Sequence, residues 1–317
     1  MEIPTINMAE CQSTQTSRQT LVAEIRRACE NQALEQSKHF FALPLDVKEK
    51  YDKNGFNRGY ERLRAQNFEK TGSGDLKEGY YFGTNLPLDH PMVVNKKFNL
   101  GPNKYPTDVQ DPEKFRQVVD TYFDSMRSLA ERLLRLLCES LEIGDEWVPR
   151  FTETPIAILR LLHYPPQAPN APDMERGIGA HTDFGALTIL LQDMVGGLQV
   201  WDRLNSQWVE VKPSKGALVV NLGNLMMRWT NDRYLSNLHR VINRSGQERY
   251  SIPFFFSGNP DFIVKCLPSE KGELKAKYPP VTVEDWIKGR YADTYAASSK
   301  VEAFGELSVA QATAAQT

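Results

Sequence analysis

The sequence predicts a mainly β protein with flanking helices, in which short strands form an antiparallel barrel or a double-sheet roll. After Pro155 the chain consists of short β-branched and aromatic runs, separated by Gly, Pro, Asn and Asp at the intervals expected of such a fold. A long helical pattern precedes them, and 317 residues can bury the core of one large β domain or of two ordinary domains. The strand-like runs are 156–162, 186–191, 198–201, 216–222 and 250–256.

Three segments before Pro155 have the spacing of apolar residues that is typical of helices. The segments are 17–30, 33–41 and 112–142. Leu43 and Pro44 end the second, because proline disfavours helix in the residue before it. The third has one broad apolar face, so we expect it to brace a sheet.

The remaining parts of the chain have weaker signals. Residues 3–7 are a short β-prone stretch, and the charged run 46–53 indicates a short solvated helix or turn. Residues 54–83 are polar and rich in glycine, which predicts a long loop with short strands that could carry substrate contacts. From Ala296 onward the chain is small and polar, and we expect a frayed tail.

Charge and composition favour a small-molecule partner. The 38 Lys and Arg residues against 40 Asp and Glu residues give a formal net charge of −2, so no global field attracts nucleic acid or anionic lipid. Nothing in the sequence indicates an obligate protein partner.

The cysteines and the N-terminus predict a cytoplasmic protein. The four cysteines are scattered singly, as expected of reduced thiols, and the sequence has neither a leader pattern nor an apolar run long enough for a membrane span. They are Cys11, Cys29, Cys138 and Cys266.

A candidate metal centre is formed by His181, Asp183 and His239. His181 and Asp183 are two positions apart, so on an extended strand both side chains project from one face. Two imidazoles and one carboxylate leave open positions on a metal, the arrangement of non-haem iron(II) oxygen chemistry. His239 lies on a later strand-like run that a rolled sheet could bring alongside. Considered alone, this pattern would more often be an ordinary histidine beside an aspartate in a turn.

Arg249 and Ser251 form a second candidate pair, which would bind an acid. On a strand they share one face, where a guanidinium can fork onto a carboxylate and the hydroxyl can add a hydrogen bond. An exposed Arg–Ser pair is the more common case. The apolar run 252–256 that follows favours a buried site.

These residues, in this order, resemble the isopenicillin N synthase-like branch of the iron(II)/2-oxoglutarate-dependent dioxygenases. Roughly residues 1–290 follow the layout of that family, and the specific motifs lie in the second half. The matching segments are Tyr164-Pro165-Pro166, His181 to Asp193, Gly196 to Val200, Trp208-Val209, Gly216 to Gly223, Ser236 to Val241 and Arg249-Tyr250-Ser251.

The resemblance implies a double-stranded β-helix (jelly roll) core, and it implies cofactors and site residues. His181, Asp183 and His239 would bind Fe(II), Arg249 and Ser251 would hold the distal carboxylate of 2-oxoglutarate, and Tyr164 would hydrogen-bond the same cosubstrate. In this family, O2 and 2-oxoglutarate give succinate and carbon dioxide while a bound substrate is oxidised by hydroxylation, desaturation or ring rearrangement. Ascorbate is expected to support activity.

The resemblance also implies a division of the chain. Residues 1–103 would be the N-terminal dioxygenase region, 104–150 a bracing helical segment, 151–292 the jelly-roll core, and 293–317 a flexible tail.

The sequence departs from the family pattern at two places. Leu162 stands where many relatives have an asparagine. After Asn31, some fifteen to twenty residues of the family layout are missing, which predicts that one strand of the roll is absent and its neighbour unpaired.

Two other functions stay open at this level. An oxidase could use the same iron triad without 2-oxoglutarate, with Arg249 and Ser251 gripping the substrate itself. Alternatively, the roll could bind a metal or ligand without catalysis. A zinc hydrolase is disfavoured because no further carboxylate is placed as a general base.

The substrate itself is not encoded in a motif. Aromatic residues and one arginine from several segments are candidates for a substrate pocket suited to a ring-containing secondary metabolite. These candidates are Arg58, Tyr60, Tyr80, Tyr81, Phe82, Trp229 and Phe256.

Overall fold

Two antiparallel sheets form the body of the molecule. The computed structural model describes residues 3–6, 32–68, 74–167, 176–267 and 276–295. The larger sheet has the strand order β1-β2-β3-β10-β5-β8 and the smaller has the order β4-β9-β6-β7. The strands of the larger sheet are β1 (Gly59–Glu61), β2 (Glu78–Gly83), β3 (Ile156–Tyr164), β10 (Arg249–Gly258), β5 (Leu187–Gln192) and β8 (Val219–Leu222). Those of the smaller are β4 (Ile178–His181), β9 (His239–Val241), β6 (Leu198–Asp202) and β7 (Gln207–Glu210), and a separate pair joins β11 (Ile263–Val264) to β12 (Val281–Thr282).

Residue alternation gives the large sheet an outer face and an inner face. On the outer face, Leu159 and Leu161 of β3 belong to the main core together with residues of α5. On the inner face, Leu162 and Tyr164 pack with Leu198 of β6 and other residues of the small sheet. The inner face is therefore the side on which the two sheets of the roll meet.

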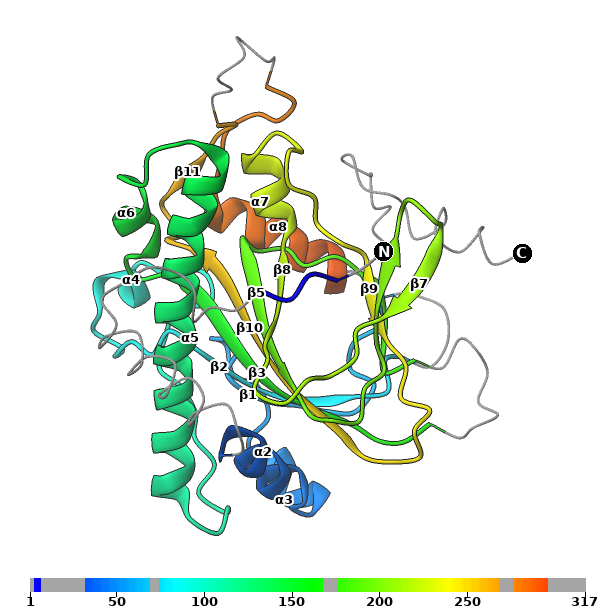
Figure 1. The fold of residues 1–317 in the computed structure, drawn as a ribbon. Coiled ribbons are helices and arrows are strands. Elements are labelled where there is room, and N and C mark those ends of the chain that lie inside the picture. Colours follow the sequence, from blue (N-terminus) through cyan, green and yellow to red (C-terminus); the bar gives the residue numbers. More distant parts are fainter. Residues whose placement is uncertain (1–2, 7–31, 69–73, 168–175, 268–275, 296–317) are drawn as a thin grey trace, which may run out of the picture.

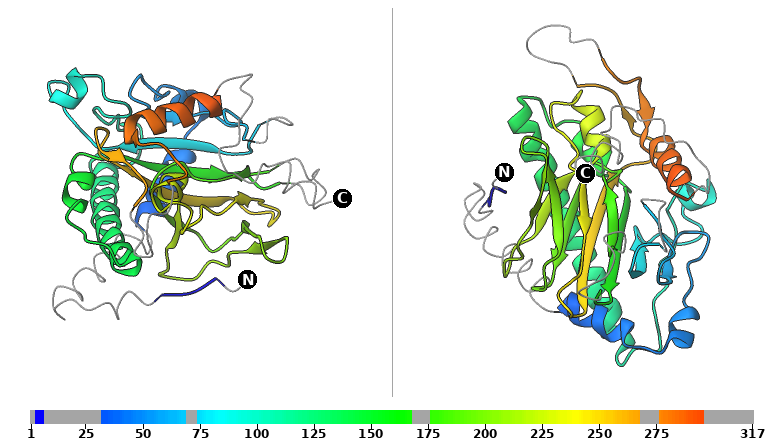
Figure 2. Two further views of the ribbon diagram at one scale, coloured as in Figure 1. Left: turned by 90° about the horizontal axis from the view of Figure 1, so that it is seen from above. Right: turned by 90° about the vertical axis from the view of Figure 1, so that its right-hand side faces the viewer.

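The helices pack around this roll (Figures 1 and 2). The long helix α5 runs beside the large sheet, α2 and α3 lie at one end of the molecule, and α7 and α8 lie at the other. The helices are α2 (Ala33–Phe41), α3 (Leu45–Glu49), α4 (Pro91–Val94), α5 (Pro112–Leu141), α6 (Val148–Thr152), α7 (Asn224–Trp229) and α8 (Val283–Tyr295).

Capping residues determine where helix α5 begins and ends. Asp111 caps its start, since the Asp111 carboxylate accepts the backbone N–H of Lys114 at 3.0 Å, and Pro112 occupies the first turn. Glu142 ends it in a left-handed conformation with φ 58°. The prediction of a bracing helix over 112–142 is confirmed, because its apolar side, from Phe115 to Leu134, forms part of the main core.

Most predicted strands and the helix at 33–41 are also confirmed. The charged run 46–53 contains α3, but it is not fully solvated: Lys48 is buried and donates to Glu78 at 2.8 Å. The segment 54–83 contributes β1 and the entirely buried β2, which extend the large sheet.

Other predicted elements are absent or cannot be placed. Residues 3–6 form no strand. The predicted helix 17–30 and the tail from Ala296 lie outside the described residues. None of the described helices is both long and apolar enough to cross a membrane.

Candidate metal centre and cosubstrate site

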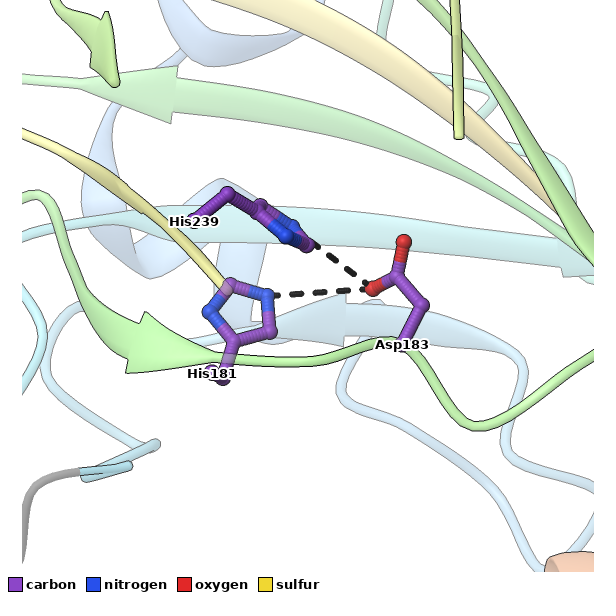
Figure 3. Close-up of side chains that lie close together, drawn as sticks. All are labelled: His181, Asp183 and His239. Atoms are coloured by element: carbon purple, nitrogen blue, oxygen red, sulfur yellow. Dashed lines mark ion pairs between the residues drawn. The ribbon is translucent and has the colours of Figure 1, made fainter. Parts of the chain in front are cut away.

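The three predicted ligands meet at one end of the small sheet (Figure 3). His181 ends β4, His239 begins β9, and the two residues pair directly across the strands. Asp183 follows β4 by two residues, and its Oδ1 lies 3.8 Å from Nε2 of each histidine. The three donor atoms all lie within 4.8 Å of one another. The pairing of β4 with β9 thus brings His181 and His239, which are 58 residues apart in the sequence, into one chelating group.

Backbone carbonyls fix which histidine nitrogens can bind a metal. Nδ1 of His181 lies 2.8 Å from the Gly179 carbonyl oxygen, and Nδ1 of His239 lies 3.0 Å from that of Asn237. A carbonyl can only accept, so each Nδ1 carries a proton, and Nε2 is the nitrogen that can bind a metal. In each histidine, Nε2 faces Asp183.

The Asp183 carboxylate is oriented by two donors that sequence reasoning missed. Thr188 donates its hydroxyl to Oδ2 at 2.6 Å, and the Asn221 amide donates to the same oxygen at 2.8 Å. These bonds occupy Oδ2 and leave Oδ1 facing the histidines. A polar residue in the apolar run Val219-Val220-Asn221-Leu222 was the available signal for Asn221.

The electrostatics of the triad suit a divalent cation. Burial, then the neighbouring His239, lowers the pKa of His181 to about 3, so its imidazole is neutral at physiological pH. Burial alone would raise the pKa of Asp183, but His239, His181 and the bonds from Asn221 and Thr188 bring it below its usual range. A carboxylate beside two imidazoles, with no fourth protein ligand in this group among the described residues, fits iron(II) with open positions.

Phe68 covers one side of this centre. Its ring stacks on His181 with centroids 4.5 Å apart and an interplanar angle of 17°. The same N-terminal stretch is tied to β4, since Asp75 accepts the Gly179 N–H at 2.9 Å. Residues that precede β2 therefore complete the surroundings of the metal ligands.

The predicted acid-binding residues come together on the inner face. Arg249 pairs with Tyr164 across β10 and β3, and its guanidinium carbon lies 4.7 Å from the Tyr164 ring centroid. Ser251 lies 3.4 Å from the Tyr164 hydroxyl. Burial raises the pKa of Tyr164, which keeps its hydroxyl protonated and able to donate.

Arg249 is buried with donor capacity to spare. Its side chain has no exposed surface; Nε donates to the Gly196 carbonyl at 2.7 Å and Nη2 to Gln192 at 3.3 Å. Its Nη1 has no partner in the part of the chain that the structure describes. A buried guanidinium nitrogen without an acceptor is costly, so this atom fits the carboxylate of a cosubstrate.

The predicted substrate-pocket residues do not all lie on the inner face. Five of them belong to the main core: Tyr60, Tyr80, Phe82, Trp229 and Phe256. Arg58 is also fully buried, and donates to backbone carbonyls of Phe56 and Asn99. Tyr81 alone shares the inner face, because consecutive strand residues point to opposite faces and the aromatic run 80–82 does not form one surface.

His163 of β3 does not belong to the group of metal ligands. Its Nδ1 lies 2.8 Å from Glu78, and its Nε2 contacts Glu248. It stacks on Tyr250, one residue away from the inner-face position of Arg249.

A jelly roll that holds two imidazoles and a carboxylate at one end defines a mononuclear non-haem iron oxygenase. The family model of the 2OG-Fe(II) oxygenase superfamily matches residues 155–258, and the model described as non-haem dioxygenase in morphine synthesis N-terminal matches residues 31–108. The chain belongs to the 2OG-Fe(II) oxygenase superfamily, and it is an iron(II)- and 2-oxoglutarate-dependent dioxygenase.

Named relatives agree with this. The chain is 50% identical over 276 residues to the 2-oxoglutarate-Fe(II) type oxidoreductase hxnY of Emericella nidulans, covering 86% of this chain and 79% of that protein. It is 36% identical to the clavatol oxidase claD of Penicillium crustosum, covering 83% and 82%. The crystal structure of a full-length Neurospora crassa protein in complex with alpha-KG superposes with a TM-score of 0.74 at 27% identity, covering 91% and 94%. These comparisons do not favour the oxidase without 2-oxoglutarate or the non-catalytic roll.

Proposed function

We propose that this dioxygenase oxidises a small organic molecule of secondary metabolism, and that Arg249, Ser251 and Tyr164 hold its 2-oxoglutarate. The unpartnered Nη1 of the buried Arg249, found among the described residues, carries the cosubstrate assignment. The substrate class is supported by relatives such as the clavatol oxidase, which is named for a small molecule.

The chain's own residues would divide the work as follows. His181, Asp183 and His239 would hold Fe(II), which together with 2-oxoglutarate and O2 supplies the oxidising chemistry when bound. Arg249 would take one carboxylate of 2-oxoglutarate in a charge-assisted bond from Nη1, and the Ser251 and Tyr164 hydroxyls would add hydrogen bonds. Thr188 and Asn221 hold Asp183 so that Oδ1 faces the ligand position.

The inner face also protects the cosubstrate from water. Leu162, Ile178, Leu198 and Val241 pack around Tyr164 as a small apolar cluster. Leu162, which stands where many relatives have asparagine, adds apolar surface here. An apolar wall strengthens the bond between Arg249 and a carboxylate, because charges interact more strongly when water is excluded.

Substrate discovery tests the proposal directly. Metabolite extracts would be added to the protein with Fe(II), 2-oxoglutarate and ascorbate, and succinate formation would be compared with that of the Asp183→Ala variant. Untargeted metabolite profiling after gene deletion would then identify what accumulates. We expect a small organic compound that is consumed with one equivalent of 2-oxoglutarate; turnover that is indifferent to 2-oxoglutarate would contradict the cosubstrate assignment.

Two further proposals concern the chain as a whole. We propose the division into residues 1–103, 104–150, 151–292 and 293–317, and the two family models match residues on either side of the bracing helix. We also propose a cytoplasmic location: Cys138 and Cys266 are free thiols, as a reducing compartment would leave them.

A further inference from the structure

Arg160 is a cation in the middle of an apolar strand. It pairs with Tyr81 across β3 and β2, so the two side chains share the inner face. Its guanidinium carbon lies 4.4 Å from the Tyr81 ring centroid and 4.9 Å from that of Phe255. Two rings thus hold the guanidinium in a fixed position on the inner face, through cation–π contacts.

The inner face of the large sheet also carries a residue that contacts a metal ligand. Phe255 pairs directly with Thr188 across β10 and β5, and the Thr188 hydroxyl holds Asp183. Two strand spacings, about 10 Å, separate the backbone of β5 from that of β3. Arg160 is therefore within the span of a small molecule from the iron site.

Charged side chains of both signs lie near Arg160. Lys53, Lys77 and Arg160 act on the Glu61 carboxylate, and Asp75 is the other carboxylate among the charges that act on Lys77. Glu61 is already engaged: Lys53 donates to Oε1, the Tyr81 hydroxyl donates to Oε2, and Lys77 lies 3.6 Å from Oε2. Both oxygens of the Glu61 carboxylate thus accept from side chains other than Arg160.

Exposure determines which of these groups can meet a ligand. Glu61, Lys77 and Tyr81 are at most 4% exposed. Arg160 and Phe255 are partly exposed, although most of β3 and β10 is buried. The inner face therefore presents a cation and an aromatic ring at this place, and it hides the carboxylate.

We propose that Arg160 binds the anionic group of the substrate, and that the substrate is a small ring-containing carboxylic acid. The planar guanidinium matches a carboxylate, and Phe255 offers a surface for the ring. With the carboxylate at Arg160, the oxidised carbon lies at the far side of the molecule, toward Asp183. This inference rests on the proposed function and adds to it the substrate class.

Charge selectivity tests the inference. A panel of ring-containing carboxylic acids, each paired with its carboxamide, would be added to the Fe(II) protein with 2-oxoglutarate, and succinate formed above the level without addition would be measured. We expect the best acids to stimulate at concentrations at least about tenfold lower than their amides. Arg160→Gln should raise the half-saturating concentration of the best acid by about thirtyfold or more and abolish the preference for acid over amide. Arg160→Lys should restore part of that preference, since it keeps the charge but not the planar fork.

Arg116→Gln is the matched control. Arg116 also stacks on a tyrosine, Tyr105 at 4.9 Å, but it lies on the exposed side of α5. It should leave the acid preference at the wild-type value.

Each remaining outcome has one meaning. If no acid acts better than its amide, or if Arg160→Gln leaves the preference intact, Arg160 does not bind an anion. If Arg160→Gln weakens anaerobic 2-oxoglutarate binding as much as it weakens the acid, Arg160 shapes the inner face as a whole, and the inference is overturned. Failure of the wild-type protein to bind 2-oxoglutarate would instead contradict the proposed function.

Discussion

Thr188 donates its hydroxyl to Oδ2 of Asp183 at 2.6 Å, from a strand whose neighbour carries Phe255 on the same face. Removing that donor by Thr188→Val keeps the shape of the side chain and releases one side of the carboxylate. Because groups that orient metal ligands contribute about 10- to 100-fold to metal affinity, we expect iron(II) affinity to fall by that amount. Anaerobic iron titration measures it. Thr188→Ser keeps the hydroxyl and should stay near the wild-type affinity; equal losses in both variants would point to packing instead.

Asp183→Ala should abolish iron-dependent turnover. It removes the only anionic ligand of the triad and leaves two neutral imidazoles to hold the cation. Asp183→Glu should also be damaging, because the longer side chain moves the oxygen away from the metal position. Iron content and succinate formation would be measured on variants whose circular dichroism confirms folding. Near wild-type iron affinity and rate in Asp183→Ala would refute the triad.

Arg249→Ala should weaken 2-oxoglutarate binding without changing iron binding. Charge-assisted bonds to a carboxylate in a desolvated site are worth roughly 2–4 kcal/mol, so the dissociation constant should rise by about thirty- to a thousandfold. Titrating 2-oxoglutarate anaerobically into the Fe(II) protein, followed by the visible charge-transfer band, measures this directly. Arg249→Lys should recover part of the loss, and Ser251→Ala should be milder. An unchanged titration in Arg249→Ala would place the carboxylate elsewhere.

Glu61→Gln should destabilise the metal-free protein. Glu61 is 4% exposed and interacts with the buried Lys77 and with Lys53 and Arg160, so the substitution removes a buried carboxylate from beside these cations, at a cost of about 3–5 kcal/mol. Urea unfolding at pH 7 measures the change. Glu139→Gln, on the exposed side of α5, is the control and should have little effect.

The effect of Glu61→Gln on the free energy of unfolding should depend on pH. Burial opposes ionisation of Glu61, but Lys77, Lys53 and Arg160 lower its pKa from 4.5 to about 2. A carboxyl whose pKa is lower in the folded state stabilises fully above its unfolded pKa and loses that contribution as the pH falls through the folded value. The stability difference between wild type and Glu61→Gln should therefore shrink as the pH falls from about 4.5 to 2. A difference that stays constant over this window would mean that the charge of Glu61 is not what stabilises.

Those parts of the site that depend only on the spacing of residues along one strand could be predicted from the sequence. His181 and Asp183 are two residues apart on an extended segment, and Arg249 and Ser251 alternate on one strand, so each pair could be assigned to one face. The substrate candidates could not be assigned in this way, because the sequence does not show which face of the sheet helix α5 covers. Arg160 was a visible signal, a charge inside an apolar run, but its neighbours Tyr81 and Phe255 come from β2 and β10, and their pairing is a tertiary property.

The ten-residue strand β10 has hydrogen-bonded neighbours on both sides, β3 and β5, and this has a consequence for how the protein can vary. It carries Arg249 and Ser251 near one end and Phe255 near the other, all on one face, with Tyr250, Ile252 and Phe254 on the opposite face. Sliding this strand by a single residue would exchange the two sets, burying a guanidinium in the apolar core and turning phenylalanines toward the iron. The length of β10 fixes the separation between Arg249 at one end of the site and Phe255 at the other. Insertions and deletions among homologues should therefore be confined to the connections on either side of this strand.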